Sequence, residues 1–546
     1  MNLSRNNKGL GIADCGLRIG SVKPANSMVS PERGQPCPQD FVAGKERADK
    51  AVHAPGGYGV AALCSSLASS NPQSAIRNPQ SGSVLIVVMW IAFGVVGIAL
   101  YFAHAMEMDL QASENQLAGQ QADQAIEGGA VYVSNVLANV MQLNPTSAGA
   151  MNFQPYMLPQ TNFYQINGKV GEATFWFIGR DTNDSDYSHR SPDPVFCLVD
   201  EASKANLNNT NLYNNATNWL QNLPQLQYNP NLLAAMYDWN TSNTTASVGG
   251  AKNETYNGLS PGYSVKNTNY DTVAELRMVY GMNLDLLYGE DANLNGALDP
   301  NENDGMALPP NDNANGLLEP GLIEFFTVYT HEPTNFWAPI TGSSTTTITN
   351  RVCVTNLTAV ASFIETNFAS VYSSISQKLN TLATGGTAPT SVIDFAIKSG
   401  ISEQNFITIE PYLYGSNTVG LININTASAA VLATVPGIGY NYAPSVVAFR
   451  QSNPSRLNSV FWIQDALTSA GGTNAILQAG PWITSRSFQY SADIAAVGRH
   501  GRGFRRVRFV YDCSSGVPMI VYRQDLTFLG WALGKKIHDQ VVAGKI

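Results

Sequence analysis

The sequence predicts an α+β fold with one long N-terminal helix, an antiparallel sheet, and a large, mainly α-helical domain inserted between the strands. Three observations predict it. An apolar run is followed by a long stretch without proline. Segments that alternate apolar and polar residues occur near both ends of the body, and segments rich in helix-forming residues lie between them.

The helix prediction begins with residues 84–105, VLIVVMWIAFGVVGIALYFAHA, which carry no formal charge over 22 residues. About 20 apolar residues span a bilayer as a helix. A buried core helix would show a polar stripe, which this run lacks, and the apolar region of a cleaved signal is shorter, roughly 7–15 residues. We therefore expect a transmembrane helix.

The helix is expected to continue beyond the membrane. No proline occurs from residue 83 to residue 143, and Ala, Gln, Glu, Leu and Met, which favour helices, are frequent after the apolar run. At 1.5 Å per residue such a helix reaches about 90 Å. The pair Gly128 and Gly129 marks a point where it could bend or break.

Charges on the two sides of the apolar run predict its orientation. Arg77 precedes the run, acidic residues follow it, and the next basic residue is Lys169. The side richer in Lys and Arg stays in the cytoplasm. We expect a single-pass protein with a cytoplasmic N-terminus and its body outside. That body, residues 83–546, holds 22 basic and 35 acidic residues, a balance that repels nucleic acid phosphates.

The remaining elements follow from periodicity and turn residues. Alternating segments bounded by turn residues predict strands at 172–181, 194–200, 487–497, 505–513 and 518–528. The clearest helical segments between them are 211–223, 229–239, 270–282, 359–383 and 426–439.

A glycine followed by an apolar run and a long helix resembles the N-terminus of type IV pilins and pseudopilins. Their precursors are cut after the glycine by prepilin peptidase, which implies a cut between Gly82 and Ser83 and methylation of the new terminus. Most such proteins carry Glu at the fifth mature position, where it can pair with a neighbour's N-terminal amine inside the membrane. Here that position is Val87. The K-type minor pseudopilin of bacterial type II secretion systems typically lacks this Glu and sits at the filament tip.

Further segments, in order and spacing, resemble the same general secretion pathway protein K family. They are VDEASKANLN (199–208), YDWNTSN (237–243), GAKNETY (250–256), YSVKNTNYDTVAELRMVYGM (263–282) and GLININTASAAVLATVPGIG (420–439). The resemblance covers roughly residues 82–533. It implies a minor pseudopilin of the bacterial inner membrane, with a periplasmic body, that joins other minor pseudopilins and the major pseudopilin to initiate the filament for protein export.

Five regions are expected on this basis. Residues 1–82 form a disordered leader or extension, rich in Pro, Gly and Ser, which a start codon placed too early would explain equally well. The transmembrane and pilin-type helix follows at 83–143, pilin-like strands at 144–203, the inserted α-helical domain with a calcium loop at 204–480, and C-terminal pilin-like strands at 481–546.

The strongest local motif is DANLNGALDPNE, residues 291–302, called here the first loop. A calcium loop supplies oxygen ligands from positions 1, 3, 5, 7, 9 and 12 and carries Gly at position 6. Gly296 stands at position 6, and the alternative is an Asn/Asp-rich turn. The predicted ligands are Asp291, Asn293, Asn295, the carbonyl of Ala297, Asp299 and Glu302.

A second loop, NDNANGLLEPGL at residues 311–322, is a degraded copy of the first. Position 12 is Leu322, for which Glu324 or Asp312 could compensate. Its candidate ligands for a second ion are Asn311, Asn313, Asn315 and Glu319. Calcium is the one cofactor that the sequence predicts.

The segment ININTA…VPGIG also resembles helix-hairpin-helix DNA binders, which hold a phosphate on hairpin amides helped by basic residues. Residues 401–470 contain two basic residues, Arg450 and Arg456, and three acidic residues. This charge balance does not favour binding to nucleic acid phosphates. A competence-type DNA receptor is therefore the alternative function, and no nucleic acid partner is expected. The basic run at 498–509 is expected to be a solvated hairpin face, with a docking surface for an acidic partner as its alternative.

An enzyme is not expected. GLSPG at residues 258–262 matches the G-x-S-x-G pattern of serine hydrolases, but Pro261 directly after Ser260 opposes the strand-to-helix turn which that pattern needs. The six histidines are scattered, and no HExxH or Cys/His metal spacing occurs.

Overall fold

The computed structural model describes residues 81–142, 168–183, 191–213, 219–339, 346–468 and 471–545. Side chains of residues 81–83, 140–142 and 336–350 lie outside this description. The chain divides into two compact units, residues 1–85 and 86–546. The predicted leader, residues 1–82, falls almost wholly outside the described residues.

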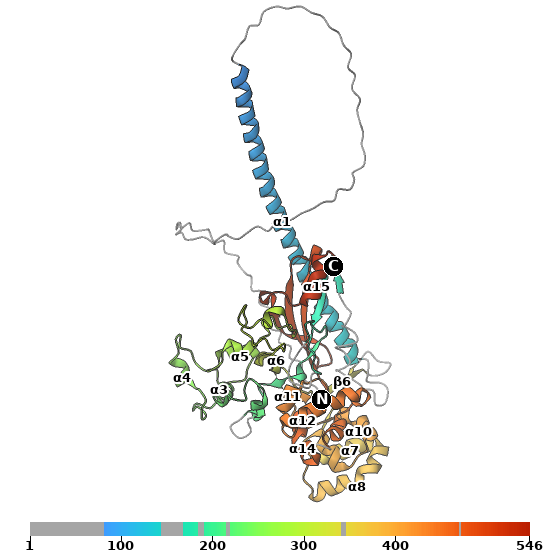
Figure 1. Cartoon of the computed structure of the whole chain (residues 1–546). Helices are drawn as coiled ribbons and strands as arrows, with labels where there is room; N and C mark the ends of the chain where they lie inside the picture. Colours follow the sequence, from blue (N-terminus) through green and yellow to red (C-terminus); the bar gives the residue numbers. More distant parts are fainter. Residues whose placement is uncertain are drawn as a thin grey trace, which may run out of the picture. The chain divides into compact units, whose positions relative to one another are not determined.

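Helix α1 (Ser81–Gln142) is one helix of 62 residues (Figure 1). It continues through Gly128 and Gly129, so the glycine pair does not interrupt it. Its side chains are exposed from Val84 to Leu110. By length and composition, α1 is the helix in the described ranges that is suited to cross a membrane. The structure therefore has the one long apolar N-terminal helix that a single-pass anchor requires.

The C-terminal half of α1 buries a stripe of small and apolar residues. Positions three or four apart share one helix face, and this stripe keeps that spacing. Its members are Ala118, Ala122, Ala125, Ile126, Ala130, Val133 and Leu137. From Ala122 onward they pack on Phe175, Ile494, Val507 and Phe509 of the sheet, and the Tyr511 hydroxyl donates to the carbonyl of Ala130 at 2.9 Å. A Cβ on Gly129 would lie 3.2 Å from Phe175, so glycine permits the close approach.

The main sheet has the strand order β1-β2-β12-β13-β14, and neighbouring strands are antiparallel. The bounds are β1 Gly168–Val170, β2 Ala173–Ile178, β12 Gln489–Val497, β13 Arg505–Asp512 and β14 Met519–Asp525. The short β3 (Val199–Asp200) pairs with the start of β12. This confirms the α+β class, with an antiparallel sheet from both ends of the body. Helix α15 (Gly534–Val542) covers the face opposite α1, where Leu533 and Ile537 pack on Trp176 and Val497.

A buried carboxylate, Asp493 on β12, holds two arginines of β13. Arg506 contacts it through Nε at 2.8 Å and Nη2 at 2.7 Å, and Arg508 through Nη2 at 2.9 Å. These two guanidinium groups hold the pKa of Asp493 well below its usual range, although burial alone would raise it. Breaking such a pair leaves an uncompensated buried charge, which costs about 3–5 kcal/mol.

The junction between the sheet and the inserted domain depends on Asp200 at the end of β3. Its carboxylate is buried and accepts hydrogen bonds from Asn423 at 2.9 Å, from the hydroxyls of Thr426 and Ser487, both at 2.6 Å, and from the Ala202 N–H at 2.8 Å. A buried polar group is tolerated when it is hydrogen-bonded in this way. The segment at residues 199–208, which contains Asp200, thus connects the sheet to the inserted domain and has a structural role.

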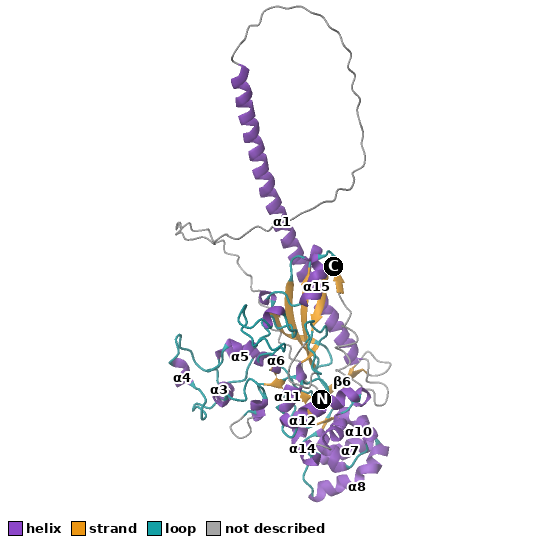
Figure 2. Cartoon of the chain, viewed as in Figure 1, coloured by secondary structure: helices purple, strands orange, loops and turns teal. Residues whose placement is uncertain are grey.

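The inserted domain is mainly helical and builds its own core (Figure 2). Its helices are α3 Pro230–Asn240, α4 Asn253–Asn257, α5 Leu284–Tyr288, α6 Leu322–Phe325, α7 Leu357–Asn367, α8 Ala369–Gly385, α9 Val392–Ser399, α10 Glu403–Ile409, α11 Ala429–Ala433, α12 Gly439–Ser452, α13 Ile463–Thr468 and α14 Gly472–Ala479. Short strand pairs join its segments: β4 Ala205–Asn206 with β5 Phe326–Thr327, β6 Asn335–Pro339 with β7 Thr346–Asn350, β8 Val352–Cys353 with β9 Leu413–Tyr414, and β10 Ile422–Asn423 with β11 Ile483–Thr484.

Several predicted helices are shorter than the sequence suggested. The segment 359–383 breaks at Phe368, and residues 270–282 contain only the 3-10 helix Val273–Met278. Residues 211–223 give, where they are described, parts of two 3-10 turns. Residues 263–282, the segment that resembles protein K, therefore form compact turns around the buried Leu276 and not a continuous helix.

The basic run at 498–509 lies against α1 and is solvated only in part. Arg502 is exposed, whereas Arg506 is fully buried. Arg502 pairs with Glu114 of α1 at 2.9 Å, and Arg505 pairs with Asp123 of α1 at 3.6 Å. The turn before β13 approaches the α1 backbone so closely that a Cβ on Gly498 would lie 2.2 Å from the carbonyl oxygen of Ala118.

The variant Gly498→Ala should lower the free energy of unfolding by about 1–3 kcal/mol, because the added methyl overpacks a contact between two backbones. Urea unfolding of the detergent-solubilised chain measures the change. The matched control is Gly385→Ala in α8, where an added Cβ meets nothing within 4 Å. Equal stability of Gly498→Ala and the wild-type chain would contradict the close packing of turn and helix.

Candidate metal centre

The first loop lies between α5 and a 3-10 turn, Pro300–Glu302, at its end. The carboxylate of Asp291 accepts from the backbone N–H groups of Asn295 at 3.0 Å and Gly296 at 2.9 Å. The side-chain oxygen of Asn293 also accepts from the N–H of Asn295, at 3.0 Å. Gly296 has φ +70°, a left-handed conformation that glycine adopts freely. The chain therefore turns around the oxygens of its first, third and fifth positions.

Glu302 closes the first loop. One carboxylate oxygen accepts from the N–H of Ala292 at 3.0 Å, and the other accepts from the N–H of Asp299 at 3.0 Å. Asn293 and Asn295 donate their side-chain amides to the carboxylate of Asp299, at 2.6 and 2.9 Å. The structure thus gathers these predicted ligands into one turn, with Asp291 and Glu302 buried. Ala297 is also buried in the loop, and its carbonyl ligand role stays a prediction.

The electrostatics of this loop favour a cation. Burial, together with Asp291 and Asp299, raises the pKa of Glu302 to about 8. Burial also raises the pKa values of Asp291 and Asp299. Within the described ranges, histidine, cysteine and carboxylate side chains alone form no group of three suited to a metal, so asparagine and backbone oxygens would have to complete the shell. A donor set made only of oxygen suits a hard cation such as calcium.

The second loop repeats part of the first. The side-chain oxygens of Asn313 and Asn315 accept from the N–H groups of Asn315 and Leu317 at 3.0 and 2.8 Å. Both asparagines donate to the carboxylate of Glu319, at 3.1 and 3.0 Å, as Asn293 and Asn295 do to Asp299. Ala314 and Gly316 have positive φ values, like Leu294 and Gly296 in the first loop.

Two residues outside the twelve of the second loop make hydrogen bonds like those of the first loop. The N–H of Gly316 donates to the side chain of Asn303 at 2.9 Å, as that of Gly296 does to Asp291, and the ligand role of Asn311 stays a prediction. Glu290 accepts from the N–H of Glu319 at 3.0 Å, as Glu302 does from that of Asp299. Glu290 therefore closes the second loop.

The two carboxylates proposed to compensate for Leu322 have other roles. Asp312 accepts from the N–H groups of Asp304 and Gly305, each at 3.0 Å, and Glu324 pairs with Arg180 at 2.7 Å. Asn303 and Glu290 escaped the prediction because they lie outside the twelve residues of the template. Only the repetition of the asparagine pattern pointed to a second loop at all.

The remaining predicted site, Gly82 and Ser83, lies in the first turn of α1. The side chain of Ser83 is outside the described part of the chain, so processing there stays a prediction.

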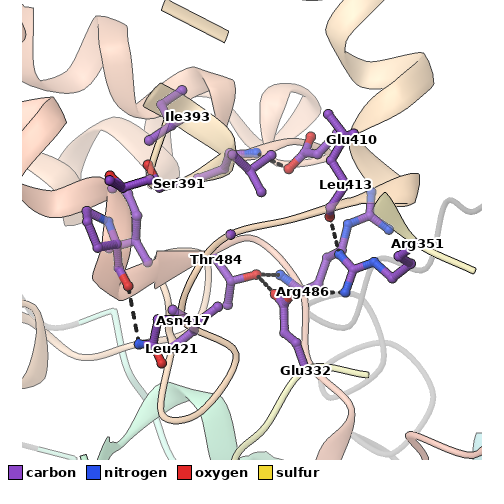
Figure 3. Close-up of a pocket in the computed structure, with 17 residues that line it drawn as sticks. Glu332, Arg351, Ser391, Ile393, Glu410, Leu413, Asn417, Leu421, Thr484 and Arg486 are labelled. Atoms are coloured by element: carbon purple, nitrogen blue, oxygen red, sulfur yellow. Dashed lines mark hydrogen bonds and ion pairs between the residues drawn. The ribbon is translucent and has the colours of Figure 1, made fainter. Parts of the chain in front are cut away.

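A polar pocket in the inserted domain is lined by Glu332, Arg351, Glu410, Thr484 and Arg486 (Figure 3). Arg351 pairs with Glu332 at 3.0 Å, and the Thr484 hydroxyl donates to the same carboxylate at 2.6 Å. The N–H of Val460 and the hydroxyl of Ser485 donate to Glu410, at 2.9 and 3.1 Å. The charged groups of this pocket are held by one another and by the backbone, which is the arrangement of a structural ion cluster.

In and next to the helical hairpin formed by α11 and α12, the arginines bind other groups of the same chain. Arg450 is buried and donates to the carbonyls of Ile424 at 3.1 Å and Ala427 at 2.6 Å. Burial lowers the pKa of its guanidinium to about 10. Arg456 pairs with Glu403 at 2.8 Å and Asp465 at 2.5 Å. Neither arginine is available as the phosphate contact of a DNA-binding hairpin.

Two family models match segments of the inserted domain. The family model described as type II secretion system (T2SS), protein K, matches residues 202–288, from the end of β3 to the end of α5. A helix-hairpin-helix motif model matches residues 417–456, which include α11 and α12. No curated protein matches the chain.

Among solved structures, the GspK-GspI-GspJ complex from the type 2 secretion system of enterotoxigenic Escherichia coli is similar at 8% identity and a TM-score of 0.30. The alignment covers 74% of this chain and 99% of that chain. The protein K match lies in the segment that joins the sheet to the inserted domain, and it ends just before the first loop. Residues 202–288 of this chain are thus similar to the type II secretion system protein K family.

Proposed function

We propose that this chain is a minor pseudopilin that occupies the tip of a type II secretion filament. There it joins other minor pseudopilins and the major pseudopilin and helps to initiate the filament for protein export. The observation that carries the proposal is α1: one half is apolar and exposed all round, and the other half is packed on an antiparallel sheet. It occurs in a chain with a protein K segment.

The two halves of α1 suit the two places where a pseudopilin resides. An apolar helix of this length is stable in a bilayer and unstable in water. After extraction from the membrane it must pack against other apolar helices, because the side chains from Val84 to Phe102 have no cover within the described part of the chain. Filament assembly supplies that cover, so we place the precursor in the inner membrane with its N-terminus in the cytoplasm and its body in the periplasm.

The tip position follows from Val87. A Glu at this mature position would pair with the N-terminal amine of a neighbouring subunit, and an unpaired charge in the membrane is expensive. Valine cannot form that pair. A subunit without it fits the one place in a filament that has no subunit above.

Processing by prepilin peptidase tests this proposal. N-terminal sequencing of the membrane-inserted chain should show a new terminus at Ser83 only when the peptidase is present. Gly82→Leu should abolish the cut, and Gly97→Leu, inside the span, should leave it intact. A chain that stays uncut, or is cut near Ala105, would contradict the pseudopilin function.

We further propose that the first loop binds calcium. Its support is the oxygen donor set gathered by Asp291, Asn293, Asn295, Asp299 and Glu302, and the pKa of Glu302, which burial raises together with the neighbouring charges of Asp291 and Asp299. Bound calcium would supply positive charge and fix the loop. The second loop is more exposed and supplies fewer carboxylates, so we expect weaker binding there, with Glu290 and Glu319 as its charged ligands.

Glu302→Gln should weaken calcium binding at the first loop at least about tenfold, because a charged ligand that can bind through two oxygens becomes a neutral one. Isothermal titration of the full chain in detergent measures the affinity. Glu254→Gln, at an exposed position of α4, is the matched control and should bind as the wild-type chain does. Unchanged affinity in Glu302→Gln would exclude this loop as the calcium site.

A further inference from the structure

Two arginines from outside the first loop donate hydrogen bonds to its backbone. Arg506 donates from Nη1 to the carbonyl of Asn293 and from Nη2 to the carbonyl of Leu294 at 2.7 Å. Arg180 donates from Nη2 to the same Leu294 carbonyl at 2.9 Å. These carbonyls lie between the side chains at the third and fifth positions of the loop, so the arginines fix the backbone from which Asn293 and Asn295 project.

Both arginines are anchored by carboxylates, one in the sheet and one in α6. Arg506 lies on β13 and binds Asp493 of β12 through two nitrogens, at 2.8 and 2.7 Å. Arg180 follows β2 and pairs with Glu324 at 2.7 Å. Each guanidinium thus has a carboxylate partner outside the loop, at 2.7–2.8 Å, while Arg180 also lies near enough to Asp291 to interact with it electrostatically.

The loop makes two more contacts with the body of the chain. Asn293 donates its side-chain amide to the carbonyl of Trp531 at 3.0 Å, and the N–H of Leu298 donates to the carbonyl of Ser191 at 2.9 Å. Leu294 has φ +54°, a left-handed conformation that is unfavourable for a non-glycine residue. The hydrogen bonds from Arg506 and Arg180 to its carbonyl offset that cost, so the turn depends on the sheet.

We propose that cation binding at the first loop is coupled to the sheet through Arg506 and Arg180, an inference that rests on the proposed calcium site. A loop fixed by calcium holds the two guanidinium groups, of which Arg506 joins β13 to Asp493 of β12 and Arg180 joins the end of β2 to Glu324 of α6. By reciprocity, a sheet that orients these arginines pre-forms the loop for the ion. Arg506 and Arg180 are positioning residues, since they act on the ligands through the backbone.

Hydrogen exchange of the full chain in detergent tests the coupling without any substitution. At a calcium concentration about 100 times Kd, amides of β12, β13 and residues 531–533 should exchange more slowly by up to about a hundredfold. Helix α8, remote in sequence and in a separate core, serves as the reference and should change little. Slower exchange confined to residues 291–302 would overturn the coupling.

A pair of variants tests the role of Arg506. Arg506→Lys keeps a positive charge for Asp493 but loses the fork that reaches two carbonyls, and it should weaken calcium binding about tenfold. Arg508→Lys is the control, because Arg508 binds the same Asp493 from the same strand without a described contact to the loop, and it should stay within about twofold of wild type. Circular dichroism checks that both variants fold.

The outcomes separate the two proposals. A wild-type chain that binds no calcium removes the site itself, and the coupling with it. A wild-type chain that binds calcium, with Arg506→Lys binding as tightly as Arg508→Lys, leaves the site intact and overturns the coupling.

Discussion

Strand β12 is the constraint on which the rest of the structure depends. It pairs with β2 on one side and with β13 on the other, and all nine of its residues are buried. Because β2 and β12 lie at opposite ends of the inserted domain in the sequence, their pairing requires that domain to begin and end at one place. The buried carboxylate of Asp200 and its four donors occupy that place, and α1 then finds a complete apolar sheet face on which to pack.

The elements with a strong period were predictable from the sequence. The apolar run of α1, its proline-free continuation and the strands β12, β13 and β14 were found where the pattern indicated. The inserted domain was less predictable, because its short helices are fixed by tertiary contacts more than by local propensity. Phe368 illustrates this: it ends α7 by packing its ring near Phe363 and Tyr412, a contact that no local pattern reveals.

The two loops show where a template succeeds and where it fails. The first loop is contiguous, so twelve residues sufficed to name the side chains that the turn gathers. The second loop borrows Asn303 and Glu290 from outside its own twelve positions, which a sequence motif cannot express. In the helical hairpin the sequence motif is present, but the structure does not support the function that the motif suggests. Arg450 is buried there and donates its hydrogen bonds to backbone carbonyls. Burial, which sequence does not display, decides between a phosphate contact and a structural role.

The contact between α1 and the sheet has a mechanical consequence. It runs along the helix from Glu114, paired with Arg502, to the buried Leu137, a length of about 35 Å. A force applied along the helix axis would load these contacts in parallel, as shear, rather than break them one at a time as peeling does. When the N-terminal helix is pulled along its axis, the sheet and the domain inserted in it would therefore move together with the helix.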